Sequence, residues 1–386
     1  MTSGKHNLLG MTLAELTTFS TSIGEQPYRG EQLFAWLYDK NATTFAAMTD
    51  LGKLLRTRLE AAASLDGLHL VSQSTSVHDG TTKFLLSLST GQHIETVLIP
   101  PASSFQGAEA KAEDEQRRLT LCVSTKVGCP LECAFCATGT MGFVRNLTAG
   151  EIIDQVRQVR LLTGKKITNV VFMGMGEPML NYANVVGAAD ILSAGMRIAA
   201  RRITISTAGW VEGIRAMAEE RRRNKLAISL HSAVDETRAL LMPITRRYNL
   251  ETLLSALAFY YRQTKQRITY EFILFDGIND TPREIHALVK LARRVPCKLN
   301  IIPFHSIAFT GPTGFPASLR PSSRLGAMVD RLRSHNLTVM VRSSAGEDIE
   351  AACGQLVVAT ERRTRPDRTT AMRAELLHPI TMLRKP

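Results

Sequence analysis

The sequence lacks any long hydrophobic run. No stretch among the 386 residues approaches the roughly 20 consecutive apolar residues that a membrane helix needs. The first 25 residues also lack the basic start and apolar core of a secretory signal, so we expect a cytoplasmic location with no membrane partner. With 44% hydrophobic and 21% charged residues, the composition is that of a globular protein, which excludes disordered, collagen and coiled-coil classes.

Cysteine is scarce, and acidic residues are outnumbered. Of only six cysteines, four lie between residues 122 and 136, a clustering that argues against a secreted disulfide framework and indicates metal or redox chemistry. Lys and Arg number 47 against 35 for Asp and Glu, so the formal charge is +12. An excess of positive charge is typical of proteins that bind a polyanion.

Residues 1–65 are predicted to form an N-terminal helical accessory domain. Apolar side chains recur at helical spacing in two sets. They are Leu33, Trp36 and Leu37, and then Leu51, Leu54, Leu55 and Leu59. The basic residues among them are Arg29, Lys40, Lys53, Arg56 and Arg58. These cations form either an ordinary solvated face or a small RNA-binding module, and the pattern leaves both interpretations open.

Residues 66–118 are predicted to connect this domain to the rest of the chain. Alternating apolar residues, a Thr90-Gly91 turn and a second apolar run predict a β-hairpin over 81–99, packed beside the main domain. Residues 101–118 carry almost no apolar periodicity and are expected to be a mobile loop. At the far end, 357–386 is a predicted basic tail. From Glu361 onward it holds seven basic and three acidic residues, so disorder is the expectation there.

From 119 to 356, short β-rich runs alternate with amphipathic segments. The runs begin at residues 119, 167, 202, 225, 268, 298 and 337. In the helical interval 148–162, Thr148 and Glu151 have the spacing of a capping box. Repeated strand and helix units predict an α/β fold, and six or seven units favour an incomplete (βα)6-type barrel, with an open sheet as the alternative. Either architecture places reactive groups on loops at the C-terminal strand ends.

Three cysteines directly follow the first of these strands. Cys129, Cys133 and Cys136 form a C-x3-C-x2-C pattern, and structural zinc would need a fourth ligand that does not follow at normal spacing. An iron–sulfur cluster held by three thiolates leaves one iron open to a cofactor. With Phe135 before the last cysteine, the pattern resembles the signature of the radical S-adenosylmethionine (SAM) superfamily.

The resemblance extends beyond the cysteine loop. The segments 122–156, GMGEPMLN at 174–181 and GEDIEAACGQL at 346–356, with PYRGEQLFAWLY near the N-terminus, resemble the RlmN/Cfr family of radical SAM RNA methyltransferases over about residues 11–360. The proline of GEPMLN favours the RlmN branch, which methylates carbon 2 of adenosine in 23S ribosomal RNA and in transfer RNA beside the anticodon. The Cfr branch, acting on carbon 8, is the alternative.

The resemblance implies a mechanism that uses two SAM molecules, a 4Fe–4S cluster and two further cysteines. Cys353 would accept a methyl group and become S-methylcysteine. A second SAM, bound at the open iron, would be cleaved reductively to a radical that takes hydrogen from this methyl group, and the methylene carbon would then add to adenine. Cys122 would resolve the adduct by attacking the Cys353 sulfur in a transient disulfide. Glu95 aligns with the family's proposed proton acceptor, although a solvated strand residue is the alternative.

The sequence independently supports roles for two of these cysteines. Leu119, Leu121 and Val123 share one strand face, so Cys122 is expected to point to the barrel interior, either as a reactive thiol or as a buried spare one. Cys353 lies among alanine and glycine residues that would let a base approach, and without the resemblance an ordinary spare thiol is an equal alternative. Cys297 begins a strand without a partner pattern and is interpreted as a core residue.

Other residues match SAM-contacting positions of the family. They are Gly176, Glu177, Ser206, Ser229, Leu230 and His231. A carboxylate such as that of Glu177 suits the SAM ammonium group. At His305 the chain departs from the family, which usually has an asparagine contacting the SAM ribose. An imidazole can still form a hydrogen bond, so His305 is also predicted to bind SAM.

RNA and an electron donor are the expected partners of a monomeric enzyme. The predicted phosphate contacts are Arg197, Arg201, Arg202, Arg221, Arg222, Arg223, Arg246 and Arg247, with the C-terminal arginines. The donor is unidentified and expected to be flavodoxin-like. A base attacked in this way must be unstacked, which favours RNA loops. A non-methylating iron–sulfur RNA-binding protein is the alternative from another class, although it leaves Cys122 and Cys353 unexplained.

Overall fold

A computed structural model of the chain describes residues 5–101, 118–342 and 345–358. The predicted loop at 101–118 lies almost entirely outside these residues, as does the predicted tail from Glu361. Within the described residues, no helix combines the length and apolarity needed to cross a membrane.

The centre of the described structure is one ten-stranded sheet, whose order is β14-β13-β12-β11-β10-β9-β6-β5-β4-β3. Seven of its strands are parallel to one another and lie where the β-rich runs predict them. They are β6 (Thr120–Cys122), β9 (Asn169–Phe172), β10 (Ile203–Thr207), β11 (Lys225–Ser229), β12 (Ile268–Leu274), β13 (Cys297–Pro303) and β14 (Val339–Val341). Since β14 and β3 are the two ends of the sheet, the barrel is incomplete, as predicted.

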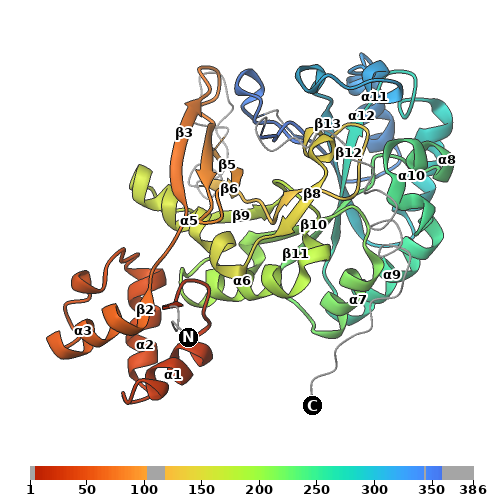
Figure 1. Ribbon diagram of the computed structural model, residues 1–386. Coiled ribbons are helices and arrows are strands. Elements are labelled where there is room, and N and C mark those ends of the chain that lie inside the picture. The colour runs from red at the N-terminus through yellow and green to blue at the C-terminus, as the bar shows by residue number, and fades with distance from the viewer. Residues whose placement is uncertain (1–4, 102–117, 343–344, 359–386) are drawn as a thin grey trace.

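Helices follow the strands and cover the outer face of the curved sheet (Figure 1). The main ones are α5 (Ala149–Thr163), α6 (Tyr182–Ala194), α7 (Val211–Glu219), α9 (Leu250–Thr264), α10 (Pro282–Ala292) and α12 (Leu325–Ser334). Shorter helices are α8 (Asp235–Leu241) and α11 (Phe315–Ser318). The capping box predicted at Thr148 and Glu151 begins α5, because both reciprocal hydrogen bonds are present. Parallel strands need such crossovers, and six of them join the seven strands in the described residues.

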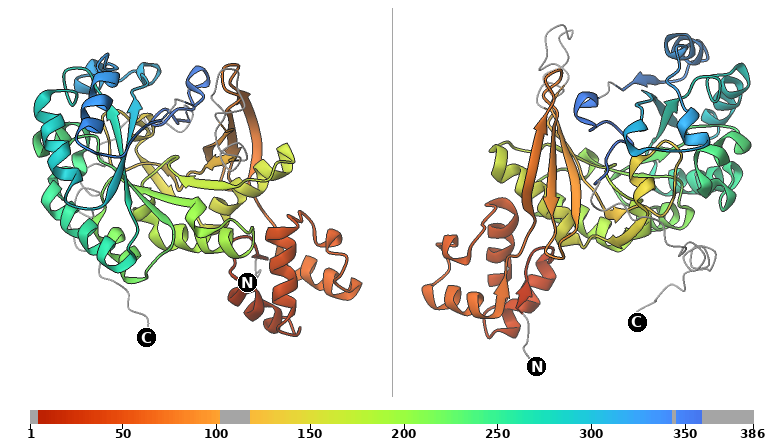
Figure 2. Two further views of the ribbon diagram at one scale, coloured as in Figure 1. Left: turned by 180° about the vertical axis from the view of Figure 1, so that it is seen from behind. Right: turned by 45° about the horizontal axis from the view of Figure 1, so that its top comes forward.

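The predicted hairpin is part of the barrel sheet. Strand β5 (His93–Ile99) pairs antiparallel with both β4 (Thr82–Ser87) and β6, so the hairpin continues the sheet beyond its parallel part (Figure 2). A third strand, β3 (His69–Thr75), forms the outer edge and was not predicted. All seven of its residues are exposed. Because neither face packs against the core, the sequence does not show the apolar alternation that identifies a strand.

The N-terminal region is helical, as predicted, and lies to one side of the barrel (Figure 1). It contains α1 (Leu13–Ser22), α2 (Arg29–Phe34) and α3 (Lys53–Ala62), while β1 (His6–Asn7) and β2 (Ala63–Ser64) join its ends. The expected apolar face is wrong at one position: Leu54 is 68% exposed, whereas Leu51, Leu55 and Leu59 are buried. Of the basic residues, Arg58 and Arg29 pair with Glu25, and Lys40 pairs with Asp50.

Buried polar contacts attach this helical region to α5. The side chains of Arg157 and Asp154 are almost fully buried and 2.6 Å apart. Arg157 also donates to the carbonyl oxygens of Leu37 and Ala42, and Asp154 accepts from the backbone N–H of Leu68. A pair this well buried is costly to break, because one charge would remain without its partner.

Replacing Arg157 with Met should therefore lower the free energy of unfolding by about 3–5 kcal/mol. Urea unfolding followed by circular dichroism measures the change. The control is Arg197→Met, which removes an ion pair with Asp39 whose arginine side chain is 75% exposed, and a change within about 0.5 kcal/mol is expected. Equal effects of the two substitutions would contradict a special role for the buried pair.

Candidate active site

The three clustered cysteines lie in a loop held from several sides. Strands β7 (Lys126–Gly128) and β8 (Phe143–Asn146), which were not predicted, pair antiparallel at the two ends of this loop. The N–H of Cys129 donates to the carbonyl of Gly142 at 2.8 Å, and that of Ala134 donates to Leu241 at 2.9 Å. These bonds fix the backbone that carries the thiols.

The thiols are free and share one apolar pocket at the C-terminal ends of the parallel strands. Burial raises the pKa of Cys129 to about 12, and burial also raises the pKa values of Cys133 and Cys136, with the neighbouring thiols as a further cause. Three buried thiols therefore need positive charge before they can be thiolates together. Iron supplies such charge, so the donor set fits a cluster.

The same pocket collects most of the residues predicted to contact SAM. Its lining includes Gly176, Glu177, Ser206, Ser229 and His231, together with the three loop cysteines and Cys353. Leu230 is not part of the lining: its side chain is fully buried, and its carbonyl accepts from Arg238. The Leu230 side chain thus points away from the pocket, because alternate strand residues point to opposite faces, and its contact with SAM stays a prediction.

Gly176 and Glu177 form a close turn after β9. Gly176 has φ +95°, and a Cβ there would lie 2.5 Å from the Lys126 side chain, so only glycine fits. Glu177 accepts from the backbone N–H groups of Met179 and Ala208 at 3.0 and 2.8 Å. Burial raises its pKa. These bonds hold the carboxyl group at the pocket wall, where it can face an ammonium group.

Arg238 and His231 organise the next strand ends. Arg238 is buried and donates to the carbonyls of Ala208 and Ser229, which follow or end neighbouring strands. The His231 ring accepts from the N–H of Ile273 at 3.0 Å, and burial with the nearby Arg238 cation lowers its pKa to about 3. A neutral His231 therefore forms part of the wall.

A second pocket adjoins the first and brings the two isolated cysteines together. Cys122 and Cys353 both line it, with Arg342 and His305. Cys353 and Arg342 belong to both pockets. Cys122 points into the barrel, as the strand periodicity predicts, and burial raises its pKa to about 12. Cys297, at the start of β13, does not line this pocket. Its thiol donates to the carbonyl of Ala292 at the end of α10.

The Cys353 loop is fastened to the cluster loop. The N–H of Ala137 donates to the carbonyl of Gly354 at 2.6 Å, and the Thr138 hydroxyl donates to Leu356 at 2.6 Å. Gly354 has φ +86°, and a Cβ there would lie 2.9 Å from the carbonyl oxygen of Phe135. Glycine thus permits the close approach that sets Cys353 between the two pockets.

Glu95 and His305 lie outside the lining of the pocket that contains the three loop cysteines. Glu95 is buried but lines neither pocket; its carboxylate lies 3.2 Å from the Lys83 ammonium and accepts from the Val357 N–H. Burial raises its pKa. His305 lines the two-cysteine pocket and is absent from the lining that carries Ser206 and His231. His305 therefore does not lie in the same pocket lining as most of the other predicted SAM contacts.

The sequence interpretation missed Arg342 and Glu271. Arg342 ends the last strand run, and the neighbouring Cys353 sulfur raises the pKa of its guanidinium group. Glu271 lies on β12 with its Oε2 4.0 Å from Arg342, and its Oε1 accepts from Asn300. A charged residue at the C-terminal end of a predicted barrel strand was the signal that could have identified Arg342.

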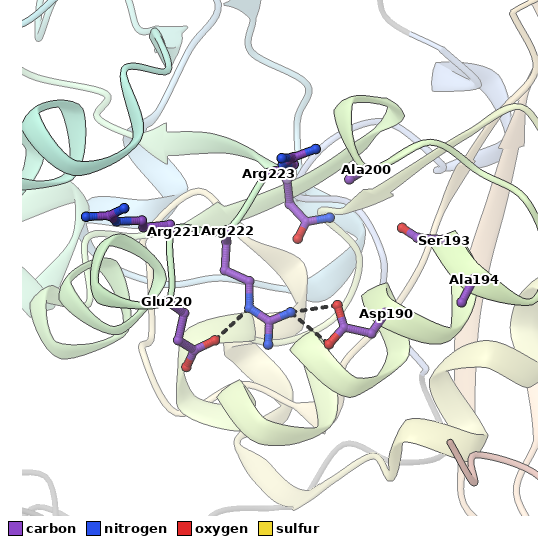
Figure 3. A pocket seen from close by; sticks show the side chains of 9 residues that line it. Asp190, Ser193, Ala194, Ala200, Glu220, Arg221, Arg222 and Arg223 are labelled. Carbon is purple, nitrogen blue, oxygen red and sulfur yellow. Dashed lines mark hydrogen bonds and ion pairs between the residues drawn. The ribbon is translucent and has the colours of Figure 1, made fainter. Parts of the chain in front are cut away.

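Several arginines predicted to contact RNA form ion pairs with acidic side chains of the same chain. Arg222 lies 2.6 Å from both Asp190 and Glu220 in a surface pocket, while Arg221 and Arg223 point away from this pair (Figure 3). Arg197 pairs with Asp39, and Arg247 contacts Glu212 and stacks over Trp210. Arg197, Arg222 and Arg247 therefore have acidic partners within the protein, and their contacts with RNA phosphates stay a prediction.

Within the described residues, no three ligand-type side chains converge on a single metal ion position. A 4Fe–4S cluster binds each thiolate through a different iron atom, so its ligands surround a shared space instead. The three thiols, the adjoining polar wall and the two-cysteine pocket form one continuous site. Such a site can hold a cluster and a SAM molecule beside the Cys353 thiol.

Comparisons with known proteins agree with this arrangement. Residues 6–65 match the family "Ribosomal RNA large subunit methyltransferase N-terminal domain", and residues 123–291 match the "Radical SAM superfamily". The chain is 42% identical over 353 residues to the dual-specificity RNA methyltransferase RlmN of Syntrophobacter fumaroxidans, covering 90% of this chain and 96% of that protein.

Two further relatives are similar over nearly their whole length. The dual-specificity RNA methyltransferase RlmN of Pseudomonas entomophila is 41% identical over 375 residues, covering 94% of this chain and 93% of its own. A crystal structure of a radical SAM methyltransferase from Sphaerobacter thermophilus has 40% identity and a TM-score of 0.80, covering 91% of this chain and 99% of that one.

Proposed function

Because the chain belongs to the RlmN family of radical SAM RNA methyltransferases, we propose that it methylates carbon 2 of adenosine in 23S ribosomal RNA and in transfer RNA. The methyl group travels on Cys353. The observation that carries this proposal is the position of Cys353, which lines both the pocket of the three loop cysteines and the pocket of Cys122.

The residues divide the work between the two pockets. Cys129, Cys133 and Cys136 would hold a 4Fe–4S cluster, and the wall that includes Glu177 and Ser229 would bind SAM. When bound, the cluster and SAM supply a carbon radical able to remove a hydrogen atom from a methyl group. Buried and closely packed walls would keep such a species away from water.

The thiols carry the carbon and release it. Carbon 2 of adenine is electron-poor, so it accepts a radical carbon more readily than it attacks an electrophilic methyl group. Cys353 would present that carbon to an unstacked base. Cys122 would then attack the Cys353 sulfur: an S–S bond forms, the S–C bond breaks, and the methylated base leaves. Glu95 is the proposed acceptor of the carbon-2 proton, and burial makes its carboxylate the stronger base.

Partners and location complete the proposal. The enzyme would act as a cytoplasmic monomer supplied with electrons by a flavodoxin-like protein. Its N-terminal helical domain would contribute to RNA binding, because it retains exposed cations such as Lys53 that form no ion pair in the described residues. The electrostatic part of such binding weakens as salt rises.

Nucleoside analysis tests the activity. The anaerobically reconstituted protein, given SAM, a reductant and unmodified ribosomal or transfer RNA, should produce 2-methyladenosine detectable by mass spectrometry. Cys353→Ala should lose all of this product, because no other thiol carries the methyl group. Appearance of 8-methyladenosine would instead assign the chain to carbon-8 chemistry. A wild-type protein that cleaves no SAM would be a non-methylating iron–sulfur RNA-binding protein.

A further inference from the structure

His305 lies beside the two isolated cysteines and outside the lining that carries most of the predicted SAM contacts. Its side chain is buried, and it lines the pocket that Cys122 and Cys353 share. Neither ring nitrogen has an aligned hydrogen-bond partner in the described residues. A buried imidazole without partners is unfavourable, so both ring nitrogens are available to a group in this pocket.

One ring nitrogen faces a carboxylate that reaches solvent. Nδ1 of His305 lies 3.0 Å from Oε1 of Glu347, at hydrogen-bond distance although not aligned for a hydrogen bond. The His305 side chain is 5% exposed and that of Glu347 is 64% exposed. The pair therefore spans the distance from the buried thiol pocket to water, and its outer member can exchange protons with the solvent.

The remaining groups that face His305 favour a thiolate in this pocket. The same pocket is lined by Arg342, directly after β14, by Cys122 of β6 and by Cys353 in the loop after the last strand. Among the described residues, Glu347 is the acidic residue that forms an ion pair with His305. Arg342 can stabilise a negative sulfur, while a neutral imidazole can take its proton.

We propose that His305 and Glu347 form a proton relay that removes the thiol proton of Cys353 before the methyl group is transferred to it. This inference rests on the proposed function and adds a catalytic residue to it. A family asparagine at this position could form hydrogen bonds but could not accept a proton near neutral pH, so the relay is a property of this chain.

The step balances without an oxidant or reductant. Nε2 of His305 takes the proton from the Cys353 sulfur, leaving a thiolate and an imidazolium whose Nδ1–H faces Glu347. The thiolate attacks the methyl carbon of SAM; a C–S bond forms to Cys353, the bond to the sulfonium sulfur breaks, and its electron pair stays on S-adenosylhomocysteine. The proton then leaves through Glu347 to water.

The test measures the nucleophilicity of Cys353 directly. The cluster-loaded protein, without SAM or RNA, is treated with iodoacetamide between pH 6 and pH 9, and alkylation of the Cys353 peptide is followed by mass spectrometry. An unassisted thiol is only a few per cent thiolate at pH 7. His305→Asn should therefore slow alkylation about tenfold at pH 7, and the difference from wild type should shrink toward pH 9, where hydroxide can take the proton directly.

Glu347→Gln should lower the rate at pH 7 in the same direction but less, since the imidazole remains. Glu350→Gln, a neighbouring exposed carboxylate outside the pocket lining, is the matched control and should behave as wild type. If His305→Asn lost its cluster, Glu347→Gln at the surface would carry the test. Equal pH profiles for wild type and folded variants overturn the relay. Because alkylation needs neither SAM nor RNA, this result is independent of whether the protein methylates RNA.

Discussion

Cys122→Ala protein should accumulate covalently attached to its RNA through Cys353. The substitution leaves Cys353 and the three loop cysteines intact while removing the thiol that shares a pocket with Cys353 and would release the base. Turnover should stop after one RNA per protein molecule. The bond is a thioether, which reductants do not open, so the added mass should persist in reductant and shrink after nuclease treatment. Intact-protein mass spectrometry measures it.

Two further variants make this result specific. Cys297→Ala removes a half-buried thiol that donates to a backbone carbonyl and lines neither of the two cysteine pockets, so it should form no adduct and retain activity. The double variant Cys122→Ala/Cys353→Ala should also form none, because the carbon carrier is gone. Release of methylated RNA by Cys122→Ala at the wild-type rate, without an adduct, would show that Cys122 is only a packing residue.

Removing any one of the three loop cysteines should abolish both iron binding and RNA methylation. Each thiol lies in the same buried loop, and a cluster with two protein ligands exposes two irons instead of one. Cys129→Ala, Cys133→Ala and Cys136→Ala should each lose the visible absorption of the cluster. Iron analysis and SAM cleavage assays measure the loss.

Cys353→Ala is the matched control for these three variants. It removes a thiol from the same pocket, yet it should keep the full iron content and still cleave SAM without methylating RNA. If iron and SAM cleavage survived in all three single variants, the ligand assignment would be wrong. If Cys353→Ala also lost its iron, Cys353 would have to be counted among the groups that maintain the cluster site.

The elements of the barrel could be predicted because each leaves a local pattern. Strand β12 is buried along its whole length, so its sequence is a continuous β-rich run. The start of helix α5 is predicted by the capping-box spacing of Thr148 and Glu151. Strand β3 has no such pattern, since both of its faces are exposed. Its place in the sheet depends on pairing with β4.

The same contrast applies to the candidate site. The cysteine loop, the inward direction of Cys122 and the class of chemistry could be predicted from the sequence alone, because spacing and alternation act over a few residues. The positions of Arg342 and His305 beside Cys122 and Cys353, and the absence of Leu230 from the pocket lining, became visible only in the folded chain. Ion pairs such as Arg222 with Asp190 were likewise decided by folding. These contacts join residues far apart in the chain, and strand order and packing, rather than local periodicity, bring such residues together.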